Sequence, residues 1–91
     1  MHTKTIYLIL TGRVQGVGFR YYAKYKAEEL GISGWVRNTS DNKVEIEATG
    51  EQDKLEIFID WMKTGPTRAI IKTVSVIEIT PMRNFTNFNI R

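Results

Sequence analysis

The sequence contains no cysteine and a single histidine, His2, which lies at an end of the chain that we expect to fray. Without cysteine the chain cannot form disulfides, which fits a reducing interior, and we predict a cytoplasmic location. The chain also lacks a thiolate nucleophile, and His2 is poorly placed to act as an imidazole nucleophile. We therefore expect no reaction that proceeds through a covalent enzyme intermediate.

Long hydrophobic runs are also missing. No stretch approaches the roughly 20 apolar residues of a membrane-spanning helix, and the first residues, Met-His-Thr-Lys-Thr, lack the apolar core of a signal peptide. The 91 residues suffice for one hydrophobic core and are too few for two. We predict one domain over residues 1–91 and no membrane partner.

Charge of one sign is not strongly in excess. Thirteen basic and ten acidic residues give a formal charge of +3, which mildly favours anionic partners. Because the basic residues are scattered along the chain, this charge is weak evidence for nucleic acid, and we expect no nucleic-acid partner.

The most informative stretch covers residues 12–20, Gly-Arg-Val-Gln-Gly-Val-Gly-Phe-Arg, between an apolar β-rich segment and a helical pattern. Its three glycines allow positive φ and close approach of a ligand to the backbone. Successive N–H groups and the start of a helix attract anions, and the Arg20 guanidinium matches two phosphate oxygens. The stretch predicts a site for a phosphate-sized dianion, although a glycine-rich loop alone is equally compatible with a tight connection.

The rest of the chain alternates strand and helix patterns, with apolar residues at every second position in the strands and at helical spacing in the helices. We predict strands at residues 4–11, 33–38, 43–49 and 71–79, a short last strand at 85–90, and helices at 19–30 and from Gly50 to Gly65.

This order is the split βαβ pattern of a ferredoxin-like α+β sandwich, in which two helices cover one face of an antiparallel sheet. Right-handed crossovers place the first and third strands at the centre, with the second beside the third. The loop before Phe19 and the end of the second strand then meet at one end of the sheet. Asn38 lies at that strand end and becomes a candidate site residue.

Simpler interpretations stand beside these. Asn38 taken alone is better explained as a turn residue, and Trp35 as a packing residue of the sheet. Glu45 and Glu47 resemble a metal pair, but the polar face of a strand explains them more simply. The Asp41-Asn42 turn tolerates the positive φ of a tight hairpin without glycine.

Four blocks of the sequence, taken together, resemble the acylphosphatase family. They are Gly12-x-Val14-Gln15-Gly16-Val17-Gly18-Phe19-Arg20, Gly34-Trp35-Val36-Arg37-Asn38, Val44-Glu45-x-x-Ala48-x-Gly50 and Gly65-Pro66-x-x-Ala69. The resemblance extends through nearly the whole chain in order. The departure is the hairpin, where the family usually has Asp-Gly and this chain has Asp41-Asn42.

The resemblance implies hydrolysis of an acyl phosphate to a carboxylate and inorganic phosphate, without metal or cofactor. It implies that Arg20 binds the phosphoryl group, that Asn38 orients the attacking water, and that Thr39 helps to hold the Asn38 side chain. It also implies a phosphate-binding loop made of Gln15, Gly16, Val17, Gly18 and Phe19.

The chemistry agrees with this implication. A carboxylate leaving group, whose conjugate acid has a pKa of roughly 4, departs at neutral pH without a general acid. Arginine stays protonated and asparagine does not titrate. We therefore predict a broad pH profile that follows the ionisation of the substrate.

Two rival functions use the same fold. A single-stranded RNA-binding module would stack bases on sheet aromatics such as Tyr7 and Trp35, but the aromatic-rich basic signature of such modules is missing. A catalytically idle regulatory module is the other. We favour the enzyme, acting as a monomer on a small-molecule acyl phosphate.

Overall fold

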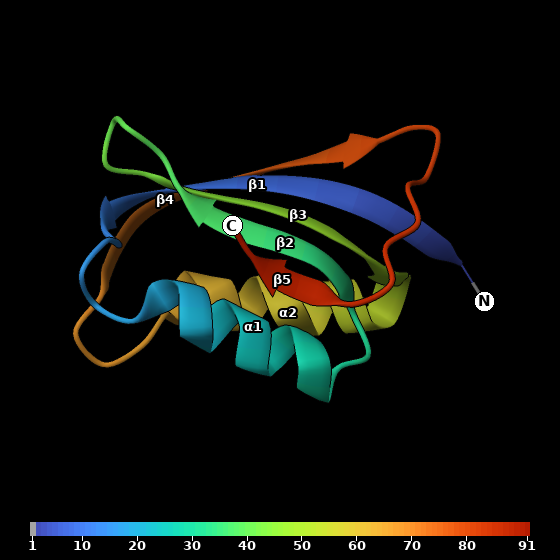
Figure 1. The fold of residues 1–91 in the computed structure, drawn as a ribbon, viewed down its shortest axis with the longest axis horizontal. Coiled ribbons are helices and arrows are strands. Elements are labelled where there is room, and N and C mark those ends of the chain that lie inside the picture. The colour runs from blue at the N-terminus through green and yellow to red at the C-terminus, as the bar shows by residue number, and fades with distance from the viewer. Residues whose placement is uncertain (1) are drawn as a thin grey trace.

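The computed structural model describes residues 2–91, which form a five-stranded sheet with two helices on one of its faces (Figure 1). The elements in chain order are β1 (Thr3–Arg13), α1 (Phe19–Glu29), β2 (Ser33–Asn38), β3 (Val44–Glu51), α2 (Gln52–Thr64), β4 (Ile70–Ile79) and β5 (Phe88–Ile90). The predicted ferredoxin-like order of strands and helices is confirmed.

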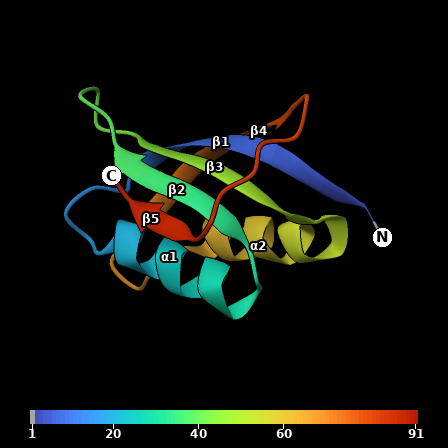
Figure 2. The ribbon, with the colours of Figure 1, turned by 45° about the vertical axis from the view of Figure 1, so that its right-hand side comes forward.

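The strands lie in the order β4-β1-β3-β2-β5 (Figure 2). β1 pairs antiparallel with both β3 and β4, β2 pairs antiparallel with β3, and β5 runs parallel to β2. The expectation that β1 and β3 are central and that β2 lies beside β3 is therefore confirmed.

The hydrophobic core fills the space between the sheet and the helices. Alternation along β1 buries Ile6, Leu8 and Leu10 under the helices, because successive side chains of a strand point to opposite faces. The matching faces are formed by the buried residues Val44, Ile46 and Ala48 of β3, Phe19, Ala23 and Ala27 of α1, and Leu55, Phe58 and Met62 of α2. Full burial of one such large side chain contributes about 1.5–3 kcal/mol, so this layer is the main source of stability.

The last strand is shorter than predicted. It begins at Phe88 rather than at residue 85, because the preceding segment crosses the sheet face opposite the helices. There the Arg83 N–H donates to Thr5 Oγ1 at 2.8 Å, and Thr49 Oγ1 donates to the Arg83 carbonyl at 2.8 Å. This segment also covers Glu47, which is only 5% exposed, so the face predicted to be polar is partly buried.

Three loops lie at the end of the sheet away from the N terminus (Figure 1). They connect β1 to α1, β2 to β3, and α2 to β4. Within residues 2–91 no helix has the length and apolar character needed to cross a membrane.

Candidate active site

The loop between β1 and α1 is held by buried side chains and leaves its backbone accessible. Val14, Val17 and Phe19 are buried in the core, whereas Gly16 and Gly18 between them are exposed. Both glycines have positive φ, 72° and 79°, and a Cβ on either would meet no atom within 4 Å. Conformation rather than crowding therefore requires glycine here, and the space above the loop is open.

The backbone N–H groups of this loop are free to bind an acceptor. Within residues 2–91, none of the N–H groups of residues 15–20 donates a hydrogen bond to a protein group, and the helix start has neither a side-chain cap nor an acidic residue in its first turn. The Tyr22 N–H donates to the carbonyl of Gly18, the residue before α1, at 3.1 Å. Unpaired donors at a helix start form a favourable anion site.

Arg20 adds a full positive charge to these donors. It lies in the first turn of α1, is half-buried, and forms no ion pair within residues 2–91. The guanidinium is thus available to an anion on the loop, with the paired N–H geometry that suits a phosphate.

Gln15 fastens the loop to the β2–β3 hairpin. Its side-chain Nε2 donates to the Thr39 carbonyl at 2.8 Å and to the Lys43 carbonyl at 2.9 Å. These bonds place the loop against the residue that follows Asn38. The sequence predicted Gln15 as a substrate-binding residue and gave no sign of this contact, in which the side chain is already engaged.

Asn38, the last residue of β2, pairs with Val44 at the start of β3. It lies on the same sheet face as Val36, the core face, because side chains alternate along a strand. Its Oδ1 is buried and accepts no hydrogen bond within residues 2–91. Since buried polar atoms are nearly always bonded, this oxygen is a strong acceptor for a group brought by substrate or solvent.

Thr39 acts on the hairpin and not on Asn38. Its hydroxyl donates to the Asp41 carboxylate and accepts from the Lys43 N–H at 3.0 Å, and no hydrogen bond joins it to Asn38 in the part of the chain described. The hydrogen bond from Thr39, followed by that from Lys43, lowers the pKa of Asp41. Asn42 adopts the positive φ of 66° that the turn requires, as predicted for a hairpin without glycine.

On the sheet face opposite the helices, the side chains on and around β2 contact one another. Trp35 is 7% exposed and lies under the guanidinium groups of Arg91 and Arg37, at 4.6 and 5.4 Å from the ring centre. Arg37 pairs with Glu45, which also accepts from the Tyr7 hydroxyl. The predicted packing role of Trp35 is confirmed. Tyr7 and Trp35, the two aromatic residues considered as platforms for base stacking, both contact other side chains of the protein.

This cluster shifts two pKa values. Burial, then the hydrogen bond to Glu45, raises the pKa of Tyr7 to about 12. Burial alone would raise the pKa of Glu45, but the hydrogen bonds from Tyr7 and Arg37 outweigh it and lower that pKa. The carboxylate therefore stays charged as part of the sheet face.

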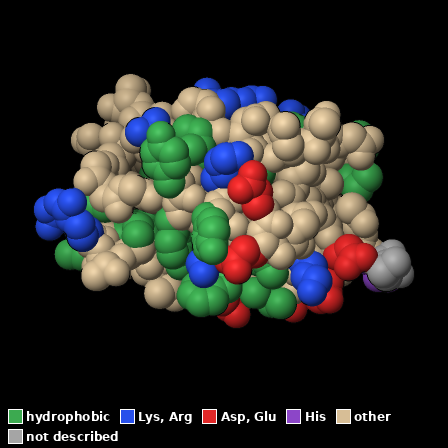
Figure 3. Space-filling view, turned by 60° about the horizontal axis from the view of Figure 1, so that its bottom comes forward, with side chains coloured by type: hydrophobic (Ala, Val, Ile, Leu, Met, Phe, Trp, Pro, Cys, Tyr) green, Lys and Arg blue, Asp and Glu red, His purple; other side chains and the backbone are tan. Residues whose placement is uncertain are grey.

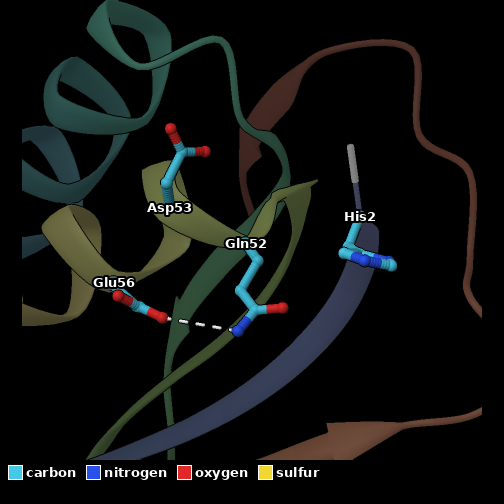
Figure 4. Close-up of a pocket in the computed structure, with 4 residues that line it drawn as sticks. All are labelled: His2, Gln52, Asp53 and Glu56. Atoms are coloured by element: carbon cyan, nitrogen blue, oxygen red, sulfur yellow. Dashed lines mark hydrogen bonds between the residues drawn. The ribbon is translucent and has the colours of Figure 1, made fainter.

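A cavity of about 390 Å³ lies at the other end of the sheet, where β1 and α2 begin (Figure 4). The cavity is lined by His2, Gln52, Asp53 and Glu56. The Asp53 side chain points away from the other three (Figure 4), and Gln52 Nε2 donates a hydrogen bond to Glu56 Oε2 at 3.5 Å. Within residues 2–91 no three His, Asp or Glu side chains are grouped to hold a metal. These side chains do not converge on a reaction centre.

Comparisons with known proteins show the family of this chain. The family model described as Acylphosphatase matches residues 6–90. The chain belongs to the acylphosphatase family. It is 43% identical over 82 residues to an acylphosphatase of Marinobacter nauticus, covering 90% of this chain and 89% of that protein. It is 46% identical over 81 residues to one from Legionella pneumophila (strain Paris), covering 89% and 88%.

Solved acylphosphatase structures have the same fold. The structure from Coxiella burnetii has a TM-score of 0.94 at 38% identity and covers 98% of this chain and 93% of that chain. The structure from Bacillus subtilis also has a TM-score of 0.94, at 34% identity and 99% coverage of both chains. The predicted family and activity are thus confirmed: this acylphosphatase hydrolyses acyl phosphates.

The fold also occurs inside a longer chain. Full-length HypF, in its phosphate- and nucleotide-bound form, matches 99% of this chain at 30% identity and a TM-score of 0.92, over 12% of its own length. An acylphosphatase fold is therefore found both alone and as part of a larger protein.

Proposed function

We propose that this acylphosphatase carries out its reaction where the β1–α1 loop meets the end of β2. The phosphoryl group binds to Arg20 and to the N–H groups of residues 15–20, and Asn38 orients the attacking water. One observation carries the proposal: the Gln15 side chain joins the loop to the residue after Asn38, so donors and an acceptor that have no partner within residues 2–91 share one end of the sheet.

The loop stabilises negative charge that develops on the phosphoryl oxygens. Its donors are held in place by buried Val14, Val17 and Phe19, so they need little reorganisation during the reaction. In phosphoryl transfer, such positioning and charge stabilisation provide most of the catalysis. Arg20 contributes the bidentate contact that a lysine at this position would not reproduce.

Asn38 fixes the water without removing its proton. Oδ1 accepts a hydrogen bond from the water, whose oxygen attacks phosphorus while the bond from phosphorus to the acyl oxygen breaks. The bonding electrons leave with the carboxylate, which needs no general acid, and both protons of the water stay with the phosphate product. We propose that no metal or cofactor takes part.

Two substitutions test these roles, with hydrolysis of benzoyl phosphate measured in excess chelator. Arg20→Lys keeps the charge but loses the planar fork, and we expect weaker phosphate binding and slower turnover. Asn38→Ala should lower kcat by roughly 10²–10³-fold, the loss typical of one preorganised hydrogen-bonding group, while phosphate still binds. Asn89→Ala, at the exposed position of β5, is the matched control. Full turnover by Asn38→Ala would exclude the water-orienting role.

The expectations of one domain over residues 1–91, a monomer and a cytoplasmic location are part of the same proposal. The alignment with the Bacillus subtilis structure over 99% of both chains supports a one-domain enzyme. Sedimentation equilibrium tests the monomer directly, and a concentration-dependent rise in mass would contradict it.

A further inference from the structure

The outward face of the two helices carries large hydrophobic side chains that are exposed. Tyr21 and Tyr25 of α1 are 71% and 63% exposed, and Ile57 and Trp61 of α2 are 42% and 41% exposed. Figure 3 shows hydrophobic side chains gathered on this face of the molecule, with acidic side chains beside them. These four residues are called the helix-face patch below.

Contacts between α1 and α2 make the patch one surface. Lys26 Nζ of α1 lies 3.7 Å from the ring centre of Trp61 and 5.9 Å from that of Tyr25. The Tyr22 hydroxyl donates to the Trp61 carbonyl at 2.9 Å. Ile57 precedes Trp61 by one helical turn, so the two side chains are neighbours on the same face of α2. The patch therefore extends across both helices.

A row of carboxylates adjoins the patch on α2. Asp53, Glu56 and Asp60 follow helical spacing, and none of them forms an ion pair within residues 2–91. The cation inside the patch differs from them, because Lys26 pairs with Glu29 at 3.6 Å. The charge that this surface offers to a partner is thus negative, which favours a partner with positive charge beside its apolar surface.

The size of the patch argues against a second copy of this chain as the occupant. A large aromatic side chain buries about 150–250 Å² in a contact, so the exposed fractions of the four residues correspond to roughly 300–500 Å². A stable interface takes about 800 Å² from each partner. Two-fold pairing of two copies would also bring the same carboxylates of both chains to one interface. A single helix of another protein is a better match.

The spacing of the carboxylates also favours a helix. Asp53 and Asp60 are seven residues apart, about 10.5 Å along the helix axis. Basic residues seven apart on a partner helix have the same separation and share one face. In an extended strand, at about 3.3 Å per residue, the residue nearest to that distance points to the opposite face. Lys54 and Lys63 lie on the two sides of the row, so Asp53 and Asp60 form the middle of the exposed helix face.

We propose that the helix-face patch and the adjoining carboxylates dock a basic amphipathic helix of another protein. The apolar face of that helix packs on Tyr25, Ile57 and Trp61, as in helix recognition through residues at i, i+3, i+4 and i+7. Its Lys or Arg residues pair with Asp53 and Asp60. The carboxylates disfavour an anionic lipid surface, which attracts basic segments. This surface is separate from the β1–α1 loop and the β2–β3 hairpin, so the inference does not depend on the proposed function.

Three synthetic peptides of about 18 residues, roughly 27 Å long when helical, test the proposal. The first has leucine at the a and d positions and lysine at the e and g positions of its heptads. The second has glutamate in place of lysine, and the third has the composition of the first in scrambled order. Titration of the ¹⁵N-labelled protein with the first peptide should give saturable shifts of the Tyr25 and Ile57 amides and of the Trp61 indole N–H. The other two peptides should bind more weakly.

Charge substitutions test the acidic row. Asp53→Asn with Asp60→Asn should weaken binding of the lysine peptide by roughly 2- to 25-fold at low salt, because exposed charge pairs contribute about 1.4- to 5-fold each. The difference should shrink at about 1 M salt, where the Debye length is roughly 3 Å. Asp41→Asn with Glu78→Gln makes the same change in charge on the β2–β3 hairpin and β4, and should leave the affinity unchanged.

Apolar substitutions test the patch itself. Ile57→Ser should weaken binding by roughly 4-fold or more, which corresponds to one buried methylene group, and Tyr25→Ser should act in the same direction. Ile77→Ser, at a 53% exposed position of β4, is the matched control. Circular dichroism checks that each variant is folded, and the exposed Asp53 and Asp60 provide a test that does not disturb the packing of the helices.

Four outcomes would overturn the proposal. They are no saturation at about 1 mM lysine peptide, equal affinity for the scrambled peptide, tighter binding of the glutamate peptide, and unchanged affinity in the Asp53→Asn, Asp60→Asn double variant. Binding to phosphatidylglycerol vesicles that Ile57→Ser abolishes would replace the partner helix by a membrane surface. A dimer that Ile57→Ser dissociates would replace it by a second copy of the chain.

Discussion

Replacing Gln15 tests the contact that holds the β1–α1 loop, the proposed phosphate-binding loop, against the hairpin. Gln15→Ala removes two neutral hydrogen bonds, of 2.8 and 2.9 Å, and leaves the Thr39 and Lys43 carbonyls without that donor. At about 0.5–1.5 kcal/mol for each bond, the free energy of unfolding should fall by about 1–3 kcal/mol. Gln15→Glu should cost more, because it directs a carboxylate at two carbonyl oxygens in a partly buried position.

The assay combines urea denaturation with benzoyl phosphate turnover. For a domain of this size each kcal/mol corresponds to about 4–8 °C in Tm, so the loss is measurable by either method. Turnover should fall as well, since a loop displaced by about 1 Å can lower the rate roughly 10²-fold. Gln52→Ala, at an exposed glutamine with one 3.5 Å contact, is the control. If Gln15→Ala unfolds at the same urea concentration as the unmodified chain, the contact does not hold the loop.

Four further predictions rest on local geometry and charge. Gly34→Ala should destabilise the fold by roughly 3 kcal/mol or more in urea denaturation, because a Cβ would lie 1.9 Å from the Glu47 carbonyl oxygen, at a φ of 144°. Asn42→Gly, at a φ of 66°, should raise the free energy of unfolding by a few tenths to about 1 kcal/mol, and a lower Tm would contradict this. Because the pKa of Glu45 is lowered, this group stabilises the fold above its ordinary pKa of 4.5, and the contribution is lost as the pH falls through the lowered pKa. Because the pKa of Tyr7 is raised, that group stabilises the fold below its ordinary pKa of 10.0, and the contribution is lost as the pH rises toward 12. Circular dichroism should therefore show that Glu45→Gln is less sensitive to acid, and Tyr7→Phe less sensitive to alkali, than the unmodified chain.

The sequence predicted the parts of the fold that depend on local periodicity. Ile6, Leu8 and Leu10 occupy alternate positions of β1 and therefore share one face, and the structure buries that face under the helices. The helix of Phe19–Glu29 and the order of strands followed in the same way from spacing and from the handedness of crossovers. Each of these features repeats along the chain and can be read without knowledge of distant contacts.

Features that depend on single polar contacts between distant residues could not be predicted. The Gln15 bond to Lys43 joins residues 28 apart, and the Arg83 bond to Thr5 joins residues 78 apart. The second contact carries residues 80–87 across the sheet, which is why β5 starts late, and it also helps to bury Glu47. A polar side chain with one distant partner leaves no periodic signal, so it looks like an ordinary exposed residue in the sequence.

In the proposed site, packing and activity depend on the same side chains of residues 14–19. The proposed anion donors are backbone N–H groups, and their positions are set by Val14, Val17 and Phe19, whose side chains lie in the core. A change in the volume of one of these side chains therefore moves the donors as well as disturbing the packing. In the proposed mechanism Arg20 and Asn38 offer side-chain groups to the reaction, so most of the proposed site consists of main chain that the hydrophobic core holds in place.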